Sequence, residues 1–147
     1  MIGDRLWLLL IVIGAIWVIG PERIEGKLAP AAMRAEIFKV ERRNEGRSTA
    51  IWGQSSRLRA GCSFEALEWR LGRRDGQNVP VRVSTPGPVV RASEGRFLFG
   101  PWVLHGVPHH AVRGTFADVL HRCRWFAGAD GKGGVSPPWR VRTPFWN

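Results

Sequence analysis

The sequence predicts an all-β domain, an antiparallel β-sandwich of about seven strands, preceded by one apolar N-terminal helix. The 147 residues are enough for one domain and too few for two. A hydrophobic fraction of 44% is sufficient for a packed core, which excludes a disordered chain. After residue 34 apolar and polar residues alternate at period two, and no helical stripe of useful length occurs outside the N-terminal segment.

The N-terminal segment contains an uninterrupted apolar run of 14 residues, Leu6 to Ile19. At about 1.5 Å per residue the run covers about 21 Å, near the lower limit for a bilayer span once the residues before it are counted. We expect residues 1–20 to form an uncleaved, single-pass transmembrane anchor in the lipid bilayer. Two alternatives are a cleaved secretory signal and a buried core helix. The sequence after Ile19 is charged and lacks a small-x-small cleavage site, and the run has no polar face.

Residues 21–34 mix proline, glycine, alanine and charges, and we expect them to link the anchor to a domain of residues 35–147. Six alternating runs within that domain are predicted to be strands. Their apolar members are Phe38 and Val40; Leu67, Trp69 and Leu71; Val79, Val81 and Val83; Phe97 to Phe99 with Trp102 to Leu104; Ala117, Val119, His121, Cys123 and Trp125; and Trp139 and Val141. Asp75-Gly76 predicts a β-hairpin, and Gly100-Pro101 predicts a bulged or kinked strand.

The two cysteines, Cys62 and Cys123, each lie in a segment with strand character and share a face with apolar neighbours. This pattern is typical of a buried inter-strand disulfide formed in an oxidising compartment. The alternative is two free cysteines that pack as small hydrophobes. Together with the anchor, the pair favours an inner-membrane protein whose C-terminal domain is periplasmic. The basic residues around the anchor, taken alone, favour the opposite orientation, but long domains translocate largely regardless of charge.

Basic residues outnumber acidic ones by 22 to 12, which gives a net charge of +10. Arginines occupy the outward positions of the last two predicted strands: Arg122, Arg124, Arg140 and Arg142. If these strands are neighbours, they form an arginine face that can bind anionic lipid headgroups, an anionic glycan or nucleic acid. The alternative is a solvated sheet face. The tryptophans take the opposite parity, so the face lacks the stacking aromatics that nucleic-acid binding needs.

The sequence predicts no enzyme, no metal site and no cofactor, and no small-molecule substrate is evident. His105, His109 and His110 fall in the segment HGVPHH, which glycine and proline make a loop, and His121 is expected in the core. Strand parity places Glu65 and Glu68 on opposite faces, so they are not expected to act as a carboxylate pair.

The apolar anchor, the early and late cysteines and the closing sequence PWRVRTPFW, residues 138–146, give a layout that resembles small membrane-anchored β-sandwich proteins of bacterial phages and prophages. A disulfide that crosses two sheets and packs against tryptophan also resembles the immunoglobulin-like sandwich. The resemblance implies a non-enzymatic structural or interaction protein of the bacterial envelope, encoded by a phage, with an envelope or phage protein as its partner. The alternative function is a basic nucleic-acid-binding domain tethered to the cytoplasmic side of a membrane.

Overall fold

The computed structural model describes residues 2–19, 25, 27–59, 61–85, 95–124 and 138–147. It contains a long helix, α1 (Ile2–Ile19), and two short 3-10 helices, η1 (Asn44–Gly46) and η2 (His109–Gly114). The strands of the described residues are β1 (Glu36–Arg43), β2 (Ser48–Arg57), β3 (Cys62–Gly72), β4 (Asn78–Val81), β5 (Val83–Ser84), β6 (Gly95–His105), β7 (Thr115–Cys123) and β8 (Trp139–Trp146).

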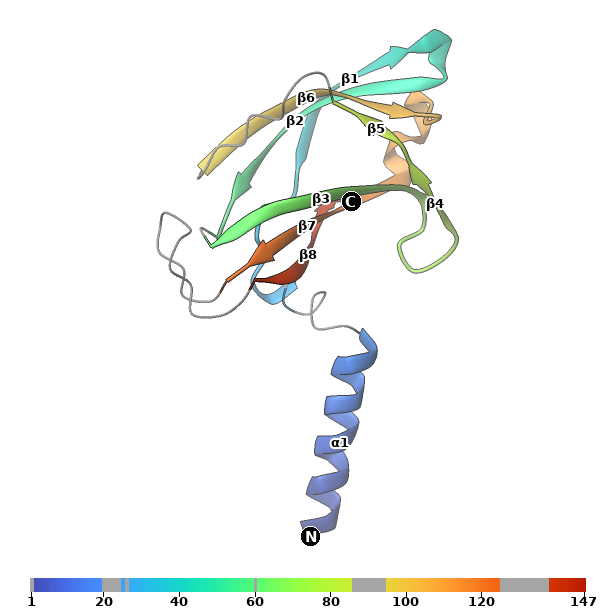
Figure 1. Ribbon diagram of the computed structural model, residues 1–147. Helices are drawn as coiled ribbons and strands as arrows, with labels where there is room; N and C mark the ends of the chain where they lie inside the picture. Colours follow the sequence, from blue (N-terminus) through green and yellow to red (C-terminus); the bar gives the residue numbers. More distant parts are fainter. Residues whose placement is uncertain (1, 20–24, 26, 60, 86–94, 125–137) are drawn as a thin grey trace.

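The strands form two four-stranded antiparallel sheets, with the orders β1-β2-β6-β5 and β4-β3-β7-β8 (Figure 1). The predicted sandwich of antiparallel sheets is confirmed, with eight strands in place of about seven. The count differs from the six predicted runs for two reasons: none of them corresponds to β2, and the run from Val79 to Val83 divides between the sheets. Val81 ends β4 in one sheet, Val83 begins β5 in the other, and Arg82 joins them.

The core lies between the two sheets and is rich in aromatic side chains. Trp69 is 2% exposed, and the Phe99 ring stacks on Trp102 with 4.2 Å between the ring centroids. Phe145 from β8 packs against the same pair, at 5.6 Å from Phe99. Trp69 and Trp102 therefore face the core, as the alternation of apolar and polar residues along their strands predicts.

The segment before β1 joins the two sheets along one side of the sandwich. Ala32 forms a β-bridge with Arg57 at the end of β2. On β8, the Thr143 hydroxyl accepts a hydrogen bond from the Ala31 N–H at 3.2 Å, and the Ala35 N–H donates to a main-chain carbonyl of the same strand at 2.6 Å. Residues 31–35 thus act as part of the domain, although the sequence predicts a linker up to residue 34.

Irregular pairing changes which side chains face the core. The β1–β2 register shifts between Ile37 and Lys39, so Phe38 is 60% exposed while Ile37 and Val40 pack against the core. The prediction that Phe38 shares a face with Val40 is therefore wrong. The predicted irregularity at Gly100-Pro101 is confirmed, because the β2–β6 register shifts at the same level of the sheet.

Figure 1 shows α1 projecting away from the sandwich. The side chains described along it are exposed, including those of Trp7 and Trp17. Within the part of the chain that the structure describes, no helix is long and apolar enough to cross a membrane.

Candidate functional site

Cys62 and Cys123 form a disulfide, as predicted, and they are 2% and 0% exposed. The two residues are directly paired across β3 and β7, with 4.0 Å between their Cα atoms. Because β3 and β7 are neighbours in one sheet, the bridge does not cross the sandwich. The predicted inter-sheet disulfide of an immunoglobulin-like domain is therefore wrong. The bridge instead fixes the register of a single strand pair.

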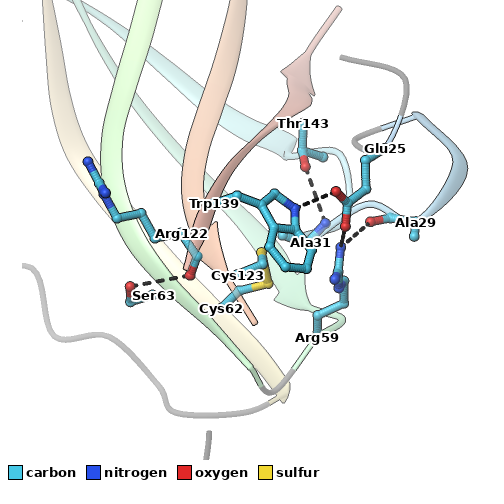
Figure 2. Close-up of a disulfide and its surroundings, with 10 residues drawn as sticks. All are labelled: Glu25, Ala29, Ala31, Arg59, Cys62, Ser63, Arg122, Cys123, Trp139 and Thr143. Carbon is cyan, nitrogen blue, oxygen red and sulfur yellow. Dashed lines mark hydrogen bonds and ion pairs between the residues drawn. A yellow bond between two sulfur atoms is a disulfide. The ribbon is translucent and has the colours of Figure 1, made fainter. Parts of the chain in front are cut away.

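The disulfide lies at the corner of the sandwich where the segment after α1 is attached (Figure 2). Trp139 on β8 pairs with Cys123 and packs against the disulfide. Its indole Nε1 donates to Glu25 Oε2 at 2.5 Å, and Arg59 Nη1 donates to Glu25 Oε1 at 2.9 Å. The side chains of Glu25 and Arg59 are only 17% and 18% exposed, so solvent screens this ion pair weakly. A carboxylate beyond α1 is thus held by β8 and by Arg59, which follows the end of β2.

The predicted arginine face lies on the outer side of β7 and β8, where Arg122 and Arg140 are register partners. These arginines are matched by acidic side chains. Arg140 binds Glu65 with two hydrogen bonds of 3.1 and 2.7 Å, and Arg122 approaches the same carboxylate at 3.3 Å. Arg124, at the end of this row, is exposed. The face is therefore a mixed-charge surface and not a continuous basic one.

Glu65 and Glu68 share this outer face, contrary to the sequence prediction. The β3–β7 register shifts between Phe64 and Ala66. Simple alternation therefore fails across this point, and residues an odd number apart on either side of it can face the same way. The hydrogen bond from Arg140 lowers the pKa of Glu65. The hydrogen bond from Arg142 Nη1, 2.6 Å long, lowers the pKa of Glu68 in the same way. Both carboxylates are held ionised at neutral pH, a state unsuited to donating a proton.

Arginine side chains also cover the outward residues of β7, the central strand of this region. Arg74, in the hairpin between β3 and β4, donates to Asp118 and lies over the Phe116 ring at 4.7 Å. Asp118 and Phe116 are 8% and 7% exposed. Asp75-Gly76 predicts this hairpin, and the pairing of β3 with β4 confirms it. The role of Arg74 was missed because it depends on a strand 44 residues away.

A hollow of about 280 Å³ lies in this outer face. Charged side chains of both signs line it: Lys27, Glu68, Arg70, Arg74, Asp75, Asp118 and Arg142. A second hollow, of about 460 Å³, lies on the other sheet beside Ser84 and His105. The first is the stronger candidate for a ligand site, because its polar groups come from four strands, a hairpin and the segment after α1.

The histidines are dispersed over the molecule. His105 ends β6 and its Nε2 is 2.7 Å from Ser84 Oγ, but among the described residues no carboxylate is hydrogen-bonded to its ring. His109 and His110 begin η2, and His121 is buried on β7 with its ring edge-on to Phe64. No group of three side chains suited to a metal ion occurs in the described ranges.

The comparisons found no match: no protein-family model, no curated protein and no solved structure is similar to this chain at a significant level.

Proposed function

We propose that the protein is a non-enzymatic, membrane-attached structural or interaction component of the bacterial envelope, with α1 in the bilayer and the sandwich in the periplasm. The observation that carries the proposal is the exposure of apolar side chains around α1. Six consecutive residues, Leu8 to Ile13, are 43–65% exposed. Successive residues on a helix point about 100° apart, so these side chains face every direction.

A lipid environment accounts for this exposure better than water does. Burying an apolar side chain of this size in an apolar medium contributes about 1.5–3 kcal/mol. The indoles of Trp7 and Trp17, 69% and 78% exposed, lie toward the two ends of the run, where they would meet the headgroup region. The 18 residues of α1 extend over about 27 Å, which is a few ångströms short of the roughly 30 Å hydrocarbon core.

The disulfide supports a periplasmic location for the sandwich, and the contacts of Glu25 beside the disulfide support a position close to the membrane. A buried bridge between Cys62 and Cys123 suits an oxidising compartment. Glu25, six residues beyond the end of α1, is held by Trp139 and Arg59. The tether between bilayer and sandwich is therefore short, and the sandwich stays close to the surface in which α1 is inserted.

Nucleic-acid binding has less support. Arg140 and Arg142 direct guanidinium N–H groups to Glu65 and Glu68, and a phosphate backbone would have to displace those carboxylates.

Vesicle flotation tests the attachment. Ile11→Asp places a carboxylate in the apolar run, which opposes membrane insertion by about 3 kcal/mol at the helix centre, so this variant should float poorly while the wild type floats with the vesicles. Leu98→Asp is the matched control, because Leu98 is an equally exposed apolar residue on the sandwich. Equal flotation of the two variants would overturn the proposal. A reporter fused after Asn147 then identifies the side of the membrane.

A further inference from the structure

The hollow on the outer face of β3, β7 and β8 combines ionic groups from parts of the chain that are far apart. Arg142 on β8 and Arg74 in the hairpin engage Glu68 and Asp118. Three lining side chains have no ion-pair partner among the residues described: Lys27, Arg70 and Asp75. Arg70 donates one N–H to the neutral Asn78 side chain at 2.9 Å, which leaves its other donors for a ligand. The hollow therefore presents two cations and one carboxylate that form no close ion pair, although the charge of Arg70 also favours the ionised form of Glu68.

This charge pattern matches a particular class of ligand. Arginine and lysine together bind phosphate groups through charge-assisted hydrogen bonds. An unpaired carboxylate in the same hollow disfavours a plain anion but attracts an ammonium group. A volume of about 280 Å³ holds a headgroup-sized molecule and not a whole lipid.

We propose that the hollow binds a dipolar phosphate ester, a phosphate joined to an ammonium group as in an ethanolamine headgroup. The phosphate lies on Lys27 and Arg70, and the ammonium lies on Asp75. Lys27 is two residues beyond Glu25, which is attached to the corner of the sandwich, so the hollow lies beside the segment that leads to α1. A lipid source for the ligand rests on the proposed membrane attachment. A soluble ester as the ligand does not.

Calorimetric titration of the full chain, in a detergent that carries no phosphate, tests the site. The probes are O-phosphoethanolamine, glycerol 3-phosphate and a short-chain phosphatidylethanolamine. Lys27→Gln with Arg70→Gln removes both cations. Arg42→Gln with Arg96→Gln is the matched control, because it lowers the net charge equally at exposed positions on the other sheet. Lys27→Gln alone keeps the test valid if the double variant misfolds, since Lys27 is exposed.

We expect the Lys27/Arg70 variant to bind phosphoethanolamine about tenfold more weakly, and the control to bind as the wild type does. Asp75→Asn should reduce the preference for phosphoethanolamine over glycerol 3-phosphate. Tighter binding of the short-chain lipid identifies a membrane headgroup as the ligand, and tighter binding of the soluble ester identifies a free ester. Equal losses in the two double variants, or no binding by the wild type, would overturn the site. Membrane attachment is tested separately by vesicle flotation. A wild-type protein that does not float would contradict the attachment without contradicting the binding site.

Discussion

Glu68 lies directly opposite Asp118 across β3 and β7, and two carboxylates in that position repel each other unless cations hold them. Arg142 reaches both, at 2.6 Å from Glu68 and 3.6 Å from Asp118. Because the pKa of Glu68 is lower in the folded state, ionisation of this residue stabilises the fold. The contribution is present above the pKa of an unfolded glutamate, about 4.3, and is lost as the pH falls through the folded value.

We therefore expect Glu68→Gln to lower the free energy of unfolding at pH 7 by up to about 1 kcal/mol, the range of partly exposed ion pairs. The difference between the variant and the wild type should shrink as the pH falls through the folded pKa of Glu68, because the residue is then protonated. Urea denaturation at several pH values measures the difference. A difference that is independent of pH would show that ionisation of Glu68 plays no part.

Gly53 on β2 is tightly enclosed. A Cβ atom at this position would lie 2.7 Å from the Glu36 main-chain oxygen and would also meet the Phe99 ring. Gly53→Ala should therefore lower stability by about 1–3 kcal/mol, as overpacked cores do. Gly114→Ala is the control, since the nearest atom there is a Leu71 methyl group at 4.0 Å. Thermal unfolding compares the two, and equal melting temperatures would contradict the packing of Phe99 over β2.

At the scale of the elements, alternation in the sequence located every strand except β2, and it failed where the pairing is irregular. Trp69, Ala117 and Val141 face the core as parity predicts. Phe38 and Glu65 do not follow parity, because one-residue register shifts in β1 and β3 lie beside them. The position of a bulge depends on how a strand pairs with its neighbour. The alternation of residues within one strand therefore does not reveal it.

The disulfide links β3 and β7 over a separation of 61 residues. Closing a loop of this length stabilises the fold by about 4 kcal/mol in the chain-entropy model, so Cys62→Ala with Cys123→Ala should lower stability by about 2–4 kcal/mol. Thiol labelling of the denatured, unreduced wild type should find no free cysteine. Two reactive thiols under those conditions would rule out the bridge.

The segment of residues 31–35 depends on β8 for one of its buried hydrogen bonds. Thr143→Val removes the hydroxyl that accepts from the Ala31 N–H, and Ala31 is fully buried. A buried donor without a partner costs about 1–3 kcal/mol, so the variant should be less stable by that amount and residues 31–35 should exchange amide hydrogens faster. Thr85→Val, at an exposed position, is the control. Unchanged exchange in the Thr143 variant would argue against this attachment.

For the whole molecule, the net charge is +10, yet on the outer face of β3, β7 and β8 arginines form ion pairs with glutamates. The sequence predicts Arg122 and Arg140 at outward positions of two strands, and the pairing of β7 with β8 brings them together. The sequence did not indicate that Glu65 neutralises them, nor that Lys27 and Arg70 meet in one hollow. Those contacts join segments separated by tens of residues, and only the arrangement of the strands brings them together.

Closure of the sandwich also sets an order of events during biosynthesis. Residues 31–35 leave the ribosome early, whereas Thr143, which receives the hydrogen bond from Ala31, is 112 residues later in the chain. Until β8 has emerged, the side of the sandwich that it completes stays open and Phe145 is missing from the core. Non-local closure of this kind is slow. A chain stalled before β8 would therefore expose its apolar interior, and chaperones and proteases would recognise it as incomplete.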